Sequence, residues 1–88
     1  MKMIFAIILD HDSEPVSHAL IASGFRVTRI ASTGGFLRRG SSTLMIGVED
    51  EKVDEAIQLL KENTTASDDP GGRRGTLFVL DVKNFTQI

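Results

Sequence analysis

The chain has 88 residues, of which 41% are hydrophobic and 25% charged; this composition excludes intrinsic disorder and predicts a single folded domain over residues 1–88. Cysteine is absent, which excludes disulfides and thiolate metal sites and favours a cytoplasmic location. The net charge of −2 argues against a general binder of DNA or RNA. The apolar run at residues 3–9 is far shorter than the roughly 20 residues of a membrane span, so no membrane insertion is expected.

The first elements of the chain are predicted to be a strand and a helix. Residues 3–9 are continuously apolar, as in a strand covered on both faces. The polar segment 10–15 then supplies residue types that start helices. Four residues at helical spacing form one stripe: Val16, Ala19, Leu20 and Ser23. Gly24 is placed to end this helix in the left-handed conformation.

The middle of the chain predicts two strands that form a hairpin. Residues 25–31 alternate apolar and polar side chains, which puts Arg26 and Thr28 on the same face of a half-buried strand. Residues 42–48 form the next predicted strand. Residues 32–41 therefore connect the two strands.

A second helix and a fourth strand complete the predicted elements. Glu49, Asp50 and Glu51 place negative charge at the helix start, where the helix dipole favours it. The apolar stripe of this helix consists of Val53, Ala56, Ile57 and Leu60. Residues 63–75 lack periodicity and predict a loop, and residues 76–82 predict a strand.

The order β-α-β-β-α-β predicts an α+β fold of the ferredoxin-like type. In this arrangement an antiparallel four-stranded sheet carries two helices on one face. The opposite face of the sheet has no cover within the chain. Because an apolar sheet face is rarely left in water, we expect self-association through it.

Positive charge is concentrated in one part of this acidic protein. No Asp or Glu occurs between residues 15 and 48, and the basic side chains there include Arg26, Arg29, Arg38 and Arg39. This asymmetry predicts a local site for an anion.

The segment Thr33-Gly34-Gly35-Phe36-Leu37-Arg38 combines residue types that suit a nucleotide. Backbone N–H groups of a glycine-rich loop can converge on a phosphate, and an arginine binds phosphate through two parallel hydrogen bonds. Phe36 and Leu37 offer an apolar surface for a base. The glycine pair is equally compatible with a plain turn, and Arg26 and Thr28 with the solvated side of a strand.

No pattern in the sequence predicts catalysis or a metal site. His11 and His18 lack metal-binding spacing, and Asp10 and Asp12 are interpreted as helix-start residues. No serine lies in a nucleophile motif, and no Walker or dinucleotide-binding glycine pattern is complete. The chain is therefore predicted to bind a ligand without being an enzyme and without a cofactor or metal.

Several segments resemble the PII-like cyclic di-AMP receptor family. The most specific is ASTGGFLRRG at residues 31–40. Weaker matches lie at residues 1–4, 25–28, 46–48, 53–54, 77–80 and 85–88. Together these segments span nearly the whole chain.

The resemblance implies a signal transduction protein built as a homotrimer of ferredoxin-like subunits with their sheets facing inward. One cyclic di-AMP would bind in each cleft between neighbouring subunits, and the loops would signal to a protein effector that the sequence does not name. Gly47 would let the ligand approach, and Gln87 would reach the site from the tail. The ligand-binding residues carried over by position are Arg26, Thr28, Gly35, Phe36, Leu37, Arg38, Ser41, Gly47 and Gln87.

Two features depart from the family pattern. Ser41 stands where members usually have Asn, and a single hydroxyl cannot duplicate the donor and acceptor functions of an amide at an adenine edge. This difference predicts reduced affinity or base selectivity. The connection at residues 63–75 is shorter than the insertion of typical members, which predicts a different partner or response.

Three alternative functions fit the same architecture. A PII-type sensor of ATP or another nucleotide would use the same glycine-containing loop. An acylphosphatase-like hydrolase would use Arg26 and Arg38, but no residue is evident that would orient the attacking water. An RNA-binding module is disfavoured because the predicted strand 42–48 has no aromatic side chain on which a base could stack.

Overall fold

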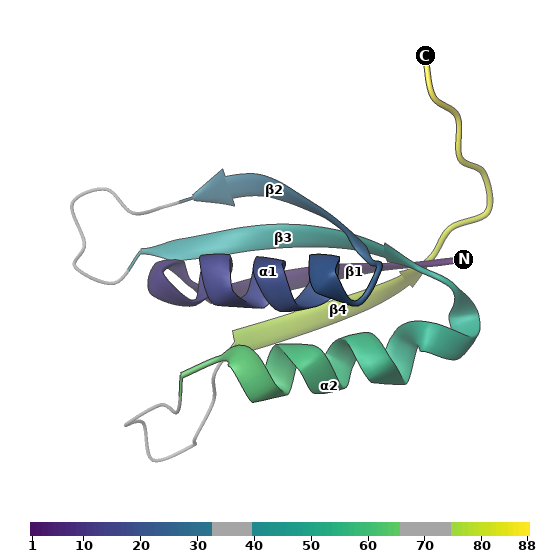
Figure 1. Ribbon diagram of the computed structural model, residues 1–88. Helices are drawn as coiled ribbons and strands as arrows, with labels where there is room; N and C mark the ends of the chain where they lie inside the picture. The colour runs from purple at the N-terminus through teal and green to yellow at the C-terminus, as the bar shows by residue number, and fades with distance from the viewer. Residues whose placement is uncertain (33–39, 66–74) are drawn as a thin grey trace.

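The computed structural model describes residues 1–32, 40–65 and 75–88. The elements follow the predicted order (Figure 1): β1 (Lys2–Leu9), η1 (Asp10–Asp12), α1 (Ser13–Ala22), β2 (Arg26–Ser32), β3 (Ser41–Val48), η2 (Asp50–Lys52), α2 (Val53–Asn63) and β4 (Gly75–Asp81). The boundaries of the strands differ from the predicted ones by one residue. Within the described ranges, no helix is long and apolar enough to cross a membrane.

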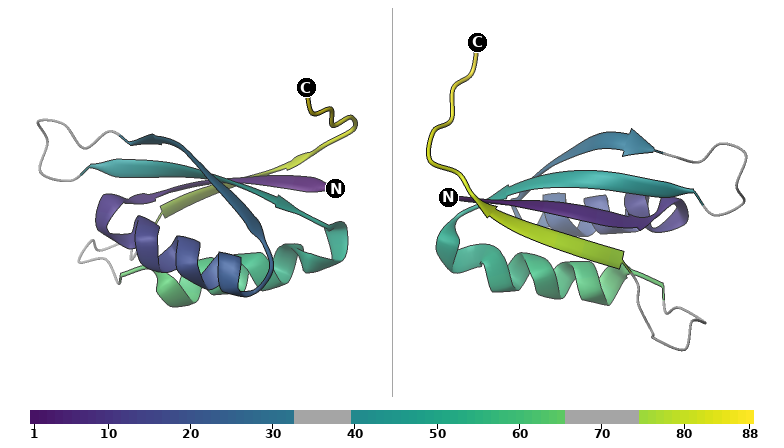
Figure 2. Two further views of the ribbon diagram at one scale, coloured as in Figure 1. Left: turned by 45° about the horizontal axis from the view of Figure 1, so that its top comes forward. Right: turned by 180° about the vertical axis from the view of Figure 1, so that it is seen from behind.

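The four strands form one sheet in the order β2-β3-β1-β4. β1 lies in the middle and pairs antiparallel with both β3 and β4, while β2 pairs antiparallel with β3. Both helices lie on the same side of the sheet (Figures 1 and 2). The predicted ferredoxin-like α+β fold, including the hairpin of β2 and β3, is confirmed.

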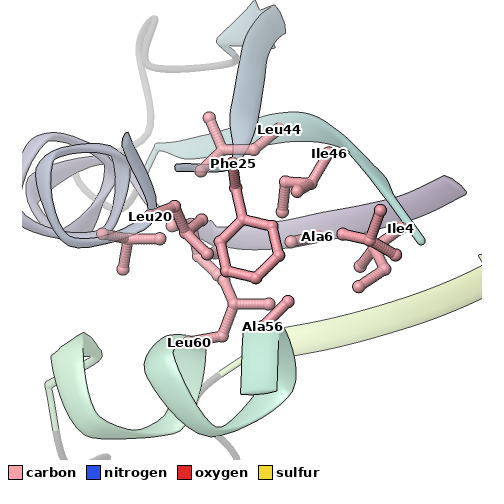
Figure 3. Close-up of a cluster of buried hydrophobic side chains, with 11 residues drawn as sticks. Ile4, Ala6, Leu20, Phe25, Leu44, Ile46, Ala56 and Leu60 are labelled. Carbon is pink, nitrogen blue, oxygen red and sulfur yellow. The ribbon is translucent and has the colours of Figure 1, made fainter. Parts of the chain in front are cut away.

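The core lies between the sheet and the two helices (Figure 3). Every second residue of β1 and β3 points into it, as the alternating burial of both strands shows. The buried apolar residues are Ile4, Ala6, Ile8, Val16, Leu20, Phe25, Leu44, Ile46, Val48, Ala56 and Leu60. The prediction that β1 is covered on both faces is therefore wrong for the single chain, because Ile7 on its other face is 37% exposed.

The predicted helix stripes are confirmed except at the end of α1. Val16 and Leu20 are buried, and in α2 Ala56 and Leu60 are buried while Val53 and Ile57 pack against the core. Ser23 is exposed because α1 ends at Ala22, one residue before it.

Gly24 ends α1 in the predicted left-handed conformation, with φ +92°. An added Cβ would meet no atom within 4 Å, so a side chain has space here. The positive φ is then the reason why a residue larger than glycine is unfavourable. We expect Gly24→Ala to lower the free energy of unfolding by about 1–2 kcal/mol, the cost of this conformation in a residue with a Cβ. Urea denaturation measures the change, and Ser23→Ala is the control at the adjacent exposed position. Equal stability of the two variants would contradict the prediction.

Lys2 and Asp81 connect the outer ends of β1 and β4. They are register partners, and the Lys2 ammonium donates a hydrogen bond to the Asp81 carboxylate. This bond lowers the pKa of Asp81 from its ordinary 3.8 and raises the pKa of Lys2 from 10.5. Its stabilising effect is therefore complete between these two values. It is lost as pH falls through the lowered pKa of Asp81 or rises through the raised pKa of Lys2.

Because this ion pair is exposed, its effect on stability is expected to be small and sensitive to salt. We expect Asp81→Asn to lower the urea midpoint slightly at pH 7, and the difference from the wild type to vanish in strong acid and at 1 M salt. Urea denaturation at pH 7 and pH 2 checks this. If the wild type and Asp81→Asn differ in urea midpoint by the same amount at pH 2 as at pH 7, the contribution of Asp81 to stability does not come from its charge.

Candidate functional site

The sheet face that points away from the helices, here called the open face, carries an apolar surface. The open face is formed by alternate residues of the paired strands, which include both apolar and polar side chains. They are Met3, Phe5 and Ile7 of β1, Thr43, Met45 and Gly47 of β3, Thr76, Phe78 and Leu80 of β4, and Arg26 and Thr28 of β2. Phe78 and Leu80 are 52% and 49% exposed. The uncovered apolar face predicted from the sequence is therefore present.

Arg26, Thr28 and Gly47 come together at the β2 side of the open face. Arg26 is the register partner of Gly47, and Thr28 is the partner of Met45. Arg26 and Thr28 are both exposed, as the alternation of residue types predicts. A guanidinium, a hydroxyl and a backbone segment without a side chain thus lie on neighbouring strands. This combination can bind a phosphate or a polar base edge.

Gly47 lies where another part of the chain comes very close. A Cβ built on this glycine would lie 3.0 Å from Cε of Met1, which is tighter than an ordinary contact. The Met1 side chain therefore lies against the surface that Gly47 leaves free. Any larger residue at position 47 would require Met1 to move.

The other predicted site residues are not gathered at this point. Ser41 begins β3 opposite Leu9 and is half-buried, at the far end of the strand from Gly47. Gln87 is exposed in the tail that follows β4, and this tail extends on the side of the sheet away from the helices (Figures 1 and 2). The remaining predicted site residues, Gly35, Phe36, Leu37 and Arg38, lie outside the described residues.

A polar cluster that the sequence analysis missed joins η1, β2 and β3 on the helix side of the sheet. The Ser42 hydroxyl donates a hydrogen bond to Oδ1 of Asp10. Nη2 of Arg29 donates to Oγ of Ser42 at 3.0 Å and lies 3.5 Å from Oδ1 of Asp10. The alternation of side chains in β2 and β3 could have indicated part of this cluster, because it places Arg29 and Ser42 on the sheet face that is otherwise apolar. The partner Asp10 is 32 residues from Ser42, and no local sequence pattern predicts that these two side chains meet.

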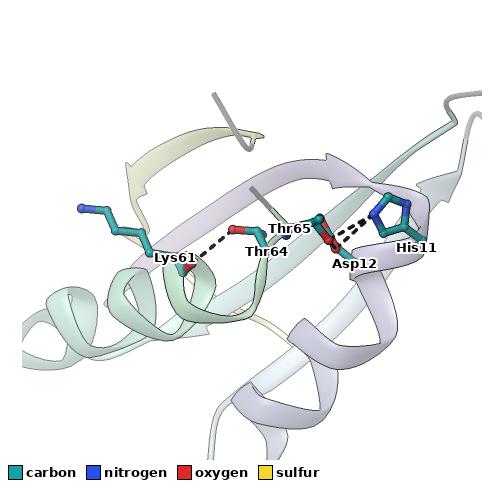
Figure 4. A network of polar contacts seen from close by, with 5 residues as sticks. All are labelled: His11, Asp12, Lys61, Thr64 and Thr65. Carbon is teal, nitrogen blue, oxygen red and sulfur yellow. Dashed lines mark hydrogen bonds and ion pairs between the residues drawn. The ribbon is translucent and has the colours of Figure 1, made fainter. Parts of the chain in front are cut away.

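A second network connects η1 to the end of α2 (Figure 4). The buried Asp12 carboxylate accepts hydrogen bonds from the backbone N–H of Thr65, at 3.1 Å, and from its hydroxyl. Nε2 of His11 lies 3.1 Å from Oγ1 of Thr65 and 3.4 Å from Oδ1 of Asp12. At the end of α2, the Thr64 hydroxyl donates to the carbonyl oxygen of Lys61 at 3.3 Å.

Asp12 is a helix-start residue, as interpreted from the sequence, but these contacts give its side chain a different partner from the one a capping residue would have. It occupies the position before α1, but its side chain makes no capping hydrogen bond because it binds Thr65 instead. His11 is exposed and also contacts this network. Among the residues that the structure describes, no group of three or more His, Cys, Asp or Glu side chains could hold a metal ion.

The protein is thus a small ferredoxin-like domain. The uncovered side of its sheet carries the exposed residues Arg26 and Thr28 next to Gly47. Residues 1–70 match the family described as "Cyclic-di-AMP receptor". The chain belongs to this family, and the resemblance seen in the sequence is confirmed.

A solved structure from Pediococcus pentosaceus ATCC 25745, described as a functionally unknown protein, is similar over nearly the whole length. It shares 32% identity with a TM-score of 0.78, and the alignment covers 99% of this chain and 96% of that chain. This similarity supports the fold and adds no function of its own.

Proposed function

We propose that this protein is a non-enzymatic receptor that binds cyclic di-AMP at the β2 side of its open face. The observation that carries the proposal is the position of Arg26 and Thr28, exposed and beside Gly47, in a chain of the cyclic-di-AMP receptor family. β2 also leads directly into residues 33–39, where the proposed ligand residues Gly35, Phe36, Leu37 and Arg38 follow in sequence.

The chemistry of these groups suits a cyclic dinucleotide. The ligand carries two phosphates, and the Arg26 guanidinium offers a fixed pair of N–H donors to one of them. The Thr28 hydroxyl can donate and accept hydrogen bonds. Gly47 has no side chain of its own, so a ligand could approach its backbone once the flexible Met1 side chain moves aside. Neighbouring apolar side chains such as Met45 provide a surface on which an adenine can pack. Charge and apolar contact are thus supplied on adjacent strands.

The proposed assembly is a homotrimer whose subunits pack through the open face. Phe5, Phe78 and Leu80 lie on this face and form an apolar surface over β1 and the edge strand β4, which a second copy of the chain would remove from water. One dinucleotide would bind in each cleft between subunits. In this arrangement Ser41 and the tail residue Gln87 would complete the site.

The proposed response is a change in the loops that alters contact with a protein effector. Binding can shift such an equilibrium only if the ligand interacts differently with the two loop arrangements. A change in the hydrogen exchange of loop amides when ligand saturates the protein is therefore expected.

The decisive experiment is calorimetric titration of the protein with cyclic di-AMP, cyclic di-GMP and ATP, with the oligomer mass measured in the same buffer. Saturable binding of cyclic di-AMP alone, at one molecule per subunit of a trimer, is the expected result. Chromatography of the ligand after incubation should recover it intact. Preferential binding of ATP would instead favour a mononucleotide sensor, and hydrolysed ligand would contradict a receptor without enzymatic activity.

A further inference from the structure

We infer that Asp10, Arg29 and Ser42 form a positioning cluster that holds β2 and β3 in the arrangement required for ligand binding. The inference rests on the proposed function, because it assigns a role toward cyclic di-AMP to residues that do not touch it. These three side chains point to the helix side of the sheet, whereas the proposed ligand residues Arg26, Thr28 and Gly47 lie on the open face.

Ser42 is the centre of the cluster. It is fully buried, at 0% exposure, so its hydroxyl cannot reach a ligand on the other side of the sheet. The hydroxyl donates its proton to Asp10 and accepts from Nη2 of Arg29 at 3.0 Å, which uses both functions of the group. Asp10 adds a backbone contact, since its N–H donates to the carbonyl oxygen of Gly40 at 3.0 Å. The cluster therefore connects η1 and β2 to the residues at the start of β3.

The cluster also lies where the pairing of β2 with β3 changes register. Arg29 pairs with Leu44, but the next regular pair is Ala31 with Thr43, so one extra residue, Ile30, is accommodated in β2. An extra residue in one strand weakens local pairing and bends the strand. Side-chain bonds from Arg29 across to Ser42 and Asp10 supply contacts between the strands at this irregular point.

Because of strand geometry, contacts on the helix side of the sheet also fix the positions of residues on the open face. Successive residues in a strand point to opposite faces, so fixing Arg29 on the helix side fixes Thr28 on the open side. Fixing Ser42 does the same for Ser41. Because binding groups must be held within about 0.5 Å of their productive geometry, loss of the cluster is expected to weaken binding without removing any ligand contact.

The test compares two variants that each delete a hydroxyl bonded to an aspartate of η1. Ser42→Ala removes the hydroxyl bonded to Asp10, and Thr65→Ala removes the hydroxyl bonded to Asp12. Calorimetry measures the Kd for cyclic di-AMP, and urea denaturation measures stability. We expect both variants to be destabilised, but only Ser42→Ala to bind about tenfold more weakly, which corresponds to ~1.4 kcal/mol.

A double-mutant cycle distinguishes positioning from general stability. If Asp10 and Ser42 act as one unit, Asp10→Asn combined with Ser42→Ala should lose no more affinity than either single change. Asp10→Asn keeps the shape of the side chain and provides a second variant should Ser42→Ala fail to fold. In heteronuclear NMR, the amide signals of Thr28 and Ser41 should shift in both single variants and stay unchanged in Thr65→Ala.

The outcomes separate this inference from the proposed function. Wild-type protein that does not bind cyclic di-AMP would overturn the proposed function, and the inference with it. Wild-type protein that binds, together with unchanged Kd in Ser42→Ala and Asp10→Asn, would overturn the inference alone. An equal loss of affinity in Ser42→Ala and Thr65→Ala would also overturn it, because it would reduce the cluster to a general contribution to stability.

Discussion

Replacing Arg26 with alanine is expected to weaken the binding of cyclic di-AMP by about 10- to 100-fold. Hydrogen bonds to charged groups contribute about 1.5–3 kcal/mol each, and about 1.4 kcal/mol corresponds to a tenfold change in Kd. Arg26 is exposed and lies opposite Gly47, which has no side chain. The substitution should therefore remove a ligand contact and leave the thermal unfolding midpoint almost unchanged.

The control for this prediction is Lys52→Ala. It removes the same unit of positive charge from η2, at an exposed residue before α2. Calorimetric titration of both variants at two salt concentrations separates a specific contact from general attraction of an anion, because general attraction is screened by salt. Equal weakening in the two variants would show that Arg26 acts only through net charge, and an unchanged Kd in Arg26→Ala would remove it from the site.

Replacing Phe78 with glutamate is expected to convert the proposed trimer into folded monomers of about 9.6 kDa. Phe78 is 52% exposed and is the register partner of Phe5 on the open face. A carboxylate buried there between subunits would be desolvated without a partner, which costs far more than it does in water. The separated monomer keeps Phe78 outside its own core, so its circular dichroism spectrum should match the wild type.

The matched control is Ile21→Glu. Ile21 is a similarly exposed apolar residue, at 57%, but it lies on α1 and not on the open face. Sedimentation equilibrium should show wild-type and Ile21→Glu protein as trimers and Phe78→Glu as a monomer that also binds cyclic di-AMP weakly. A trimer that persists in Phe78→Glu would place the subunit interface on another surface.

The elements of this fold could be predicted because their signals are local. The alternation of residues 25–31 placed Arg26 and Thr28 on one face, and Gly24 supplied the one backbone position that ends α1. The open face also followed from the order of elements, since the β-α-β-β-α-β arrangement places both helices on the same face of the sheet. The continuous apolar run of β1 was misleading, because its outward-facing residues are apolar without being covered in the single chain.

The contacts between distant segments could not be predicted in the same way. Asp12 looked like a capping residue because its neighbours in sequence begin a helix, but its partner Thr65 is 53 residues away. The extra residue in β2 likewise leaves no local signal, although it determines which residues of β3 face it. The roles of Gly35, Phe36, Leu37 and Arg38 stay predictions from sequence, as they lie outside the described residues.

The central position of β1 determines the order in which this protein can fold during synthesis. β1 is translated first among the strands, yet its two partners are β3 and β4, and β4 begins only at Gly75. The edge of β1 that will pair with β4 is therefore unpaired while most of this chain is synthesised. An unpaired apolar edge favours aggregation. Pairing over such a sequence separation also raises the contact order and slows folding. Until β4 has left the ribosome, this edge stays available for pairing with a strand of another chain.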